Sequence, residues 1–257
     1  MFNDIVIGPI TIHMYGVMIA AGFLAALLMT LRRGKKRGYD EDLIWGIFFC
    51  AIIGGMLGTR ILYYIVEIPQ IIKDPSILWD FKNGYVVYGG IIGGIFAGWL
   101  YCRIKKLKFL AYFDLMMPSI ALAQGFGRIG CFLAGCCYGK ETSGPLAVTF
   151  TSSDFAPNNI PLIPTQIYSS ILDFVHFLLL LYVAKHKKAD GQVAACYLIF
   201  YSIGRFIIEF FRGDIERGSV GSFSTSQFIS IFTAIAGIIV LFVATVNKKD
   251  SRNYHKK

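Results

Sequence analysis

The stretch IHMYGVMIAAGFLAALLMTLRRGKKR, residues 12–37, places a long apolar run directly before a cluster of basic residues. Residues 12–31 contain no acidic residue, lysine or arginine. Their number is that of a helix crossing the hydrocarbon core of a bilayer, roughly 20 residues. Basic residues that flank such a helix stay in the cytoplasm. The stretch therefore predicts a membrane-spanning helix that ends on the cytoplasmic side.

Six further apolar segments follow, at about 43–66, 86–102, 109–126, 166–184, 192–211 and 226–247. Hydrophobic residues make up 55% of the 257 residues and charged residues only 16%, whereas soluble domains carry about 25% charged residues. We therefore expect one all-α integral membrane domain, residues 1–257, built as a bundle of seven transmembrane helices. We expect no cleavable signal peptide, because residues 1–10 lack the basic region that opens one.

Four basic clusters hold seventeen of the 25 lysines and arginines. They follow the first, third, fifth and seventh apolar segments, at residues 32–37, 103–108, 185–188 and 248–257. Because positive charge stays inside, we expect the N-terminus outside and the C-terminus in the cytoplasm, where the clusters contact anionic lipid. This placement explains the net charge of +9 without a nucleic-acid partner.

The longest connections then lie outside, at about 67–85, 127–165 and 212–225. The second is too long to be a simple connection, so we expect function there. A weak internal echo, IIGGMLG at 52–58 and IIGGIFAG at 91–98, admits two interpretations. Small residues four apart let helices approach closely in lipid, and this packing interpretation is favoured over a transporter-type repeat.

Three arginines stand within or at the end of apolar segments, toward the outer side: Arg60, Arg128 and Arg205. A charged group inside a span destabilises it by at least a few kcal/mol and usually faces a protein interior or a water-filled cavity. Pairing with a carboxylate is one explanation. The other is a lipid phosphate, which guanidinium groups bind in a bidentate fork.

The sixth apolar segment carries polar residues at helical spacing, which puts them on one face: Tyr201, Arg205, Glu209 and Arg212. Glu209 either neutralises the neighbouring arginines or accepts a proton from a reacting group. His13 and Tyr15 open the first segment, and their spacing alone assigns them no role. Asp114 and Asp173 are interpreted as helix-packing or interfacial carboxylates.

Together these features resemble the prolipoprotein diacylglyceryl transferase family. The motifs that carry the resemblance are spread over nearly the whole chain: HMYG at 13–16, GTR at 58–60, VYGG at 87–90, Asp114, GRIGCFLAG at 127–135, PTQIY at 164–168 and RFIIEFFR at 205–212. The glycine-rich signature and the arginine-rich stretch of the sixth segment are the most specific of them.

The resemblance implies an enzyme that moves the diacylglyceryl group of phosphatidylglycerol to the lipobox cysteine thiol of a prolipoprotein and releases glycerol 1-phosphate. It implies a bacterial-type plasma membrane, an active site toward the outer face, and no cofactor. Arg128 and Arg205 match the arginines that bind the donor and its phosphate. The catalytic candidates are Glu209, Tyr15, His13 and Tyr201. The supporting candidates are Arg60, Tyr88, Asp114, Gly127, Gly130, Gly135 and Arg212.

The chain departs from the family's usual pattern at four positions. Cys131 and Ala134 stand where asparagines are usual, Cys136 replaces an acidic residue, and Tyr88 replaces a histidine. A candidate base and an acid are therefore missing from their customary places. A tyrosine, with a pKa near about 10, is a poor base unless it is strongly perturbed.

Cys131, Cys136 and Cys137 form a compact group that leaves several interpretations open. They can be structural thiols that fill space left by the replaced polar residues. A disulfide from Cys131 to Cys136 or Cys137 is a second interpretation, because the outer side can be oxidising. A reactive thiol beside Arg128 is a third. We expect no metal site, because no histidine or acidic residue is near in the sequence.

Three other functions stay open beside the main one. A paralogue could transfer a glyceryl lipid to another acceptor. A transporter of anionic lipid would also use arginines, but few residues suit a coupling ion. A membrane thiol oxidoreductase normally has a C-x-x-C dithiol, which the chain lacks.

Overall fold

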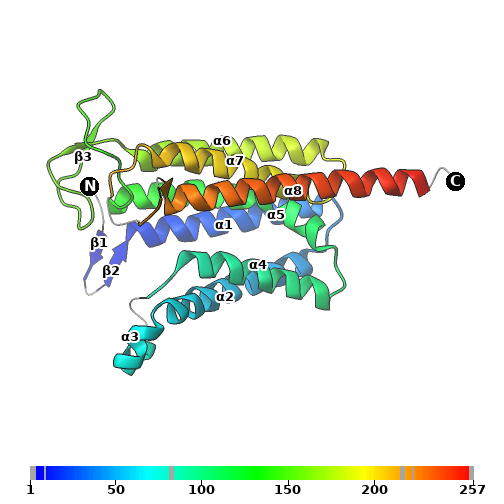
Figure 1. Cartoon of the computed structure of the whole chain (residues 1–257), viewed down its shortest axis with the longest axis horizontal. Coiled ribbons are helices and arrows are strands. Elements are labelled where there is room, and N and C mark those ends of the chain that lie inside the picture. Colours follow the sequence, from blue (N-terminus) through cyan, green and yellow to red (C-terminus); the bar gives the residue numbers. More distant parts are fainter. Residues whose placement is uncertain (1–3, 9, 81–83, 215–217, 222, 255–257) are drawn as a thin grey trace. The chain divides into compact units, whose positions relative to one another are not determined.

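The computed structural model describes residues 4–8, 10–80, 84–214, 218–221 and 223–254. Within this part of the chain, seven helices are long and apolar enough to cross a membrane. They are α1 (Met14–Lys35), α2 (Glu41–Val66), α4 (Val87–Ile104), α5 (Phe109–Ala134), α6 (Thr165–His186), α7 (Gln192–Glu209) and α8 (Thr225–Tyr254) (Figure 1). The prediction of seven helical spans is confirmed. Of the fourth basic cluster, Lys256 and Lys257 lie outside the described residues.

Short elements occupy the connections. Helix α3 (Ile68–Lys73) and a 3₁₀ turn (Pro75–Trp79) follow α2. Three antiparallel strand pairs form: β1 (Asp4–Ile7) with β2 (Ile10–His13), β3 (Val148–Thr149) with β4 (Pro161–Leu162), and β5 (Ser219–Val220) with β6 (Phe223–Ser224). They precede α1, α6 and α8, so they gather at one end of those helices.

Helix α5 is longer than the sequence predicted. The expected span ended near residue 126, whereas the helix continues to Ala134, so Arg128 and Cys131 are helical and not part of a loop. The glycines of this stretch fit close contacts between helices. A Cβ on Gly125 would lie 2.7 Å from the ring of Phe174, and one on Gly130 would lie 3.2 Å from the ring of Tyr15. Such packing offsets the poor helix propensity of glycine.

The chain divides into two compact units. The first comprises Met1–Thr30 with Phe113–Lys257, and the second comprises Leu31–Tyr112. In the first unit, Thr30 Oγ1 donates a 2.8 Å hydrogen bond to Ser119 Oγ, which joins α1 to α5. The core of this unit lies between α5, α6 and α7 and contains Met117, Ala121, Leu180, Ala184, Val193 and Ala194.

Asp114 connects α5 to the turn before α7. Its side chain is fully buried and accepts 2.9 Å hydrogen bonds from the backbone N–H groups of Gly191 and Ala194. Lys187 Nζ lies 2.9 Å from the same carboxylate and 2.9 Å from Asp190. Burial alone would lower the pKa of Lys187, but hydrogen bonds to Asp190 and Asp114 outweigh it and raise this pKa. The contacts of the charged Lys187 with Asp114 and Asp190 therefore stabilise the fold fully at any pH below the ordinary lysine pKa. This contribution is lost only as the pH rises through the raised pKa that Lys187 has in the folded protein.

In the second unit, α2 and α4 meet through glycines. A Cβ on Gly58 would overlap the carbonyl oxygen of Gly89, and one on Gly93 would overlap that of Gly54. The two glycine-rich segments therefore face one another, which confirms the packing interpretation of the sequence echo. No side chain larger than hydrogen fits at these crossing points.

Replacing Asp114 with Ala should destabilise the protein by about 3–5 kcal/mol, because two backbone donors and the partly buried ammonium group of Lys187 lose their acceptor. The matched control is Asp190→Ala, which removes an exposed partner of the same lysine and should change stability by less than about 1 kcal/mol. The measurement is the fraction of monodisperse protein after heating in detergent. Equal melting temperatures for the two variants would contradict the anchoring role of Asp114.

Gly93→Ala should weaken the α2–α4 contact by about 1–3 kcal/mol, because the added methyl group overlaps backbone atoms. Gly98→Ala on the same helix is the control, since its Cβ would lie 3.8 Å from Ile47 Cγ2, an ordinary contact. Thermal unfolding of both variants in detergent compares them. A Gly93 variant as stable as the Gly98 variant would show that the helices do not need this close approach.

Candidate functional site

A cavity of about 270 Å³ opens among α5, α6 and α7 of the first unit. Its polar lining consists of Arg128, Ser169, Asp173, His176, Tyr201 and Arg205. Its apolar lining comes from α6 and α7, and these side chains are more than a third exposed on the outside of the helices: Leu172, Val175, Leu179, Phe200, Ile203 and Ile207. The cavity therefore joins two arginines to an apolar surface of the kind that faces lipid tails.

Arg205 is held between two partners. Its Nη2 atom lies 2.9 Å from Glu209 Oε2, one helical turn further along α7. The same nitrogen donates a 2.7 Å hydrogen bond to Ser226 Oγ in the first turn of α8. Glu209 is 5% exposed, so its carboxylate and the guanidinium neutralise one another away from water. Glu209 thus pairs with Arg205, whereas Arg212 pairs with Asp214, and the proton-accepting role of Glu209 stays a prediction.

Arg128 differs from Arg205 because no ion pair joins it to any carboxylate in the described parts of the chain. Its guanidinium lies within electrostatic range of Tyr201, Cys131 and Asp173. Asp173 is only 7% exposed and lines the same cavity, although the sequence suggested a packing role. A carboxylate inside a span is a signal for a functional cavity and could have identified it.

Two rings of the cavity lining, Tyr201 and His176, are joined through the ring of Tyr197 in one stacked column. Tyr201 stacks on Tyr197 with ring centroids 5.8 Å apart, and Tyr197 stacks on His176 at 5.1 Å. Tyr197 donates a 2.9 Å hydrogen bond to Gln124 Oε1 on α5. Tyr201 therefore has a fixed position beside Arg205, one helical turn away. His176 was not identified from the sequence, because an isolated histidine in a span carries no spacing signal.

Arg212 lies beyond the end of α7 and is engaged by Asp214. Its Nε and Nη2 atoms donate to the two carboxylate oxygens at 3.1 and 2.8 Å. Burial raises the pKa of Asp214, and the charge of Arg212 opposes this shift. The backbone beside Arg212 is also bonded, because Lys140 N donates to Phe211 O at 2.9 Å. This region therefore fixes the loop that follows α5.

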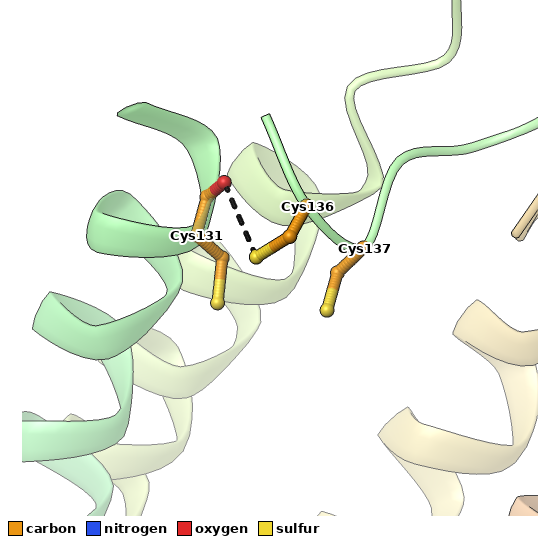
Figure 2. A group of neighbouring side chains, drawn as sticks. All are labelled: Cys131, Cys136 and Cys137. Atoms are coloured by element: carbon orange, nitrogen blue, oxygen red, sulfur yellow. Dashed lines mark hydrogen bonds between the residues drawn. The ribbon is translucent and has the colours of Figure 1, made fainter. Parts of the chain in front are cut away.

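That loop carries two of the three cysteines that lie near Arg128 in the sequence. Cys131 lies on α5, and Cys136 and Cys137 lie directly after it, with the three sulfur atoms within 4.8 Å of one another (Figure 2). All three are free thiols, and Cys136 Sγ donates to the backbone oxygen of Cys131 at 3.7 Å. Hydrogen bonds from Cys131 and Cys136, together with the charges of Arg212 and Arg128, lower the pKa of the Cys137 thiol. Cys137 is therefore the thiol that ionises first.

The model of the family described as prolipoprotein diacylglyceryl transferase matches residues 4–243. The chain belongs to this family. A relative from Clostridium tetani, named phosphatidylglycerol–prolipoprotein diacylglyceryl transferase, is 54% identical over 238 residues, which cover 93% of this chain and 95% of the relative. A second, from Clostridium perfringens and carrying the same name with the number 2, is 48% identical over 253 residues, 96% and 97% of the two chains. A third, from Clostridioides difficile, is 34% identical over 94% of each chain.

The family resemblance pointed to residues that the structure places at different distances from the cavity. Tyr15 lies in the first turn of α1, and its ring packs against Gly130 of α5. It also lies within electrostatic range of Arg128 and the three cysteines. His13 is the last residue of β2 and is exposed. Asp114 and Arg128 are both on α5, and their separation by fourteen positions corresponds to about 21 Å of helix. The structure therefore brings Tyr15 to the signature and leaves Asp114 at the other end of the helix.

The three signature glycines have separate tasks. A Cβ added to Gly127 would lie 3.5 Å from Ile19 Cδ1, which is an ordinary contact. Gly130 packs more closely against α1. Gly135 has φ +77° and follows the last residue of α5. A residue in the left-handed region at this point ends a helix, and glycine adopts it without strain. The glycines thus shape the helix and its end and leave the chemistry to side chains.

Arg60 and Tyr88 belong to the second unit. Arg60 donates to Tyr64 Oη at 2.8 Å and to Gly84 O at 3.3 Å. Its guanidinium also lies 5.4 Å from the ring centre of Tyr85 and 5.7 Å from that of Tyr63. Tyr88 is in the first turn of α4 and 42% exposed. Arg60 is therefore surrounded by the rings of Tyr63, Tyr64 and Tyr85.

Proposed function

We propose that this chain transfers the diacylglyceryl group of phosphatidylglycerol to the lipobox cysteine of a prolipoprotein. The observation that carries the proposal is that Arg128 and Arg205 line one cavity together with aliphatic and aromatic side chains of α6 and α7. A phospholipid presents a phosphate next to acyl chains, and this cavity offers guanidinium groups next to exposed aliphatic side chains. The names of the relatives from two clostridial species support the same substrate pair.

The arginines would act on the charge that develops during transfer. The acceptor sulfur forms a bond to the glyceryl carbon while the bond from that carbon to a phosphate oxygen breaks. The electron pair stays on the departing glycerol 1-phosphate, and the thiol proton passes to a base. Positive groups already fixed in a site with little water stabilise this charge strongly. Arg205, held by Glu209 and Ser226, is the better fixed of the two.

Arg128 would form the more adaptable contact with the donor. Because no described carboxylate pairs with it, an incoming phosphate does not have to displace a protein partner. Asp173 lines the same cavity and supplies a carboxylate to which the thiol proton can pass. Tyr201 also lines the cavity and stays a catalytic candidate from the resemblance. His13 and Tyr15 stay candidates from the resemblance alone.

The orientation in the membrane is part of the proposal. The basic clusters support an outer N-terminus, a cytoplasmic C-terminus and an active site toward the outer face of a bacterial plasma membrane. The family match at residues 4–243 includes both compact units, so we propose that both serve one transferase domain.

Arg128→Lys and Arg205→Lys should each lower lipid transfer by roughly 10- to 100-fold, because lysine keeps the charge but loses the bidentate fork. The assay is transfer of labelled diacylglyceryl from phosphatidylglycerol to a lipobox peptide. Arg103→Lys, at an exposed position near the end of α4, is the control and should transfer normally. Near-native transfer by monodisperse Arg128 and Arg205 variants would reject the phosphate-binding roles.

The orientation predicts which added cysteines an impermeant thiol reagent reaches in intact cells. Ser152→Cys should add label over the parent protein, and Lys188→Cys should add label only after the cells are opened, since both positions are exposed but lie at opposite ends. Lys188 is chosen because its neighbour Lys187 is engaged by Asp114. The opposite labelling pattern would reverse the proposed topology.

A further inference from the structure

We propose that Cys131, Cys136 and Cys137 form a binding site for one thiophilic divalent cation of the zinc class. The sulfur atoms lie within 4.8 Å of one another, and Figure 2 shows the three side chains facing a common space. A zinc–sulfur bond is about 2.3 Å long, so sulfurs sharing one zinc in tetrahedral geometry lie about 3.8 Å apart. Small side-chain rotations bring the thiols to that separation.

The backbone that carries the cysteines is fixed in advance. Gly135 and Cys137 both have positive φ, +77° and +62°, which turns the chain back toward the end of α5. Gln166 Nε2 donates to Cys136 O at 2.8 Å, and Thr165 Oγ1 donates to Cys137 O at 2.8 Å. Both donors are in the first turn of α6 and only 1% exposed. A rigid loop lowers the ordering entropy that metal binding must overcome.

The surrounding charge favours thiolates. Arg128 and Arg212 lie within electrostatic range of Cys137 and stabilise its anionic form. Three thiolates and one divalent cation together carry a formal charge of −1, so the two arginines attract the loaded site as a whole. The expectation of no metal rested on the lack of histidine and acidic ligands nearby in the sequence. Three thiolates need neither.

Three protein ligands leave one coordination position open, which is the arrangement of catalytic zinc sites. In the described parts of the chain, the ligand group contains only these three residues. The open position suits a fourth sulfur ligand, and a thiol that binds there loses its proton to solvent. This step rests on the proposed function, because the acceptor of that reaction is itself a cysteine thiol.

Cobalt(II) is the probe for the site. The full-length enzyme, reduced, desalted and kept in detergent, should bind one equivalent of Co²⁺ with thiolate-to-cobalt charge-transfer absorption, and Zn²⁺ should abolish the signal. Cys131→Ser, Cys136→Ser and Cys137→Ser should each weaken binding at least tenfold. Cys50→Ala in α2 should bind like the parent protein. Absence of a saturable signal, or a signal unaffected by Cys131→Ser, would overturn the proposal.

A second measurement needs no variant and so does not depend on folding of the serine proteins. Zn²⁺ should protect Cys131, Cys136 and Cys137 of the unmodified enzyme from alkylation, as counted by mass spectrometry, and leave the other cysteines unchanged. Equal alkylation with and without Zn²⁺ would overturn the metal site.

The open position is tested with a lipobox peptide added to the cobalt-loaded enzyme. The visible absorption should shift with the cysteine peptide and not with its serine analogue; no shift would reject a fourth sulfur ligand while leaving the three-thiolate site. Lipid transfer is measured on the same preparation. Transfer without Co²⁺ binding overturns the metal site alone, and Co²⁺ binding without transfer overturns the proposed function alone.

Discussion

A guanidinium group left without partners in the apolar part of a bilayer is strongly destabilising, and the arginines of this bundle are arranged accordingly. Arg60 is enclosed by tyrosine rings, Arg205 pairs with Glu209, and Arg212 is held by a neighbouring aspartate. Arg128 has no such ion pair in the described chain and instead lines a cavity with an apolar wall. An anion binds most favourably beside the positive charge that no carboxylate of the described chain neutralises. The candidate anion-binding site is therefore centred on Arg128.

Helix α5 determines where that charge stands relative to its neighbours. Near its first turns, Asp114 binds the backbone at the start of α7 and thereby sets the position of that helix. Toward its other end, Arg128 faces the residues that α6 and α7 contribute to the cavity. On α7, Arg205 follows the anchored N-terminal turns without a break. The carboxylate of Asp114 and the two arginines of the cavity are therefore connected through continuous helix, although Asp114 is far from the cavity.

The sequence predicted the features that depend on local periodicity. Seven apolar runs became seven helices, and the four-residue spacing of Arg205 and Glu209 became an ion pair. It did not predict contacts between distant segments. The length of α5 depends on partners supplied by α1 and α6, since its glycines look like loop residues when read alone. From the sequence, Asp173 is interpreted as a helix-packing or interfacial carboxylate. Its interaction with Arg128 is visible only once α5 and α6 are packed together.

The cysteines show how a site can retain a charge when its residue types change. The resemblance places an acidic residue where Cys136 stands, and an acid would carry a permanent negative charge near the arginines. Here the neighbouring thiols of Cys131 and Cys136 and the charges of Arg212 and Arg128 lower the pKa of Cys137, so the next residue along the chain takes the negative charge. One thiolate with two thiols has a formal charge of −1, and so do three thiolates with a divalent cation. Loading the cluster would therefore leave the formal charge that Arg128 faces unchanged, and donor binding and thiol coordination could operate side by side.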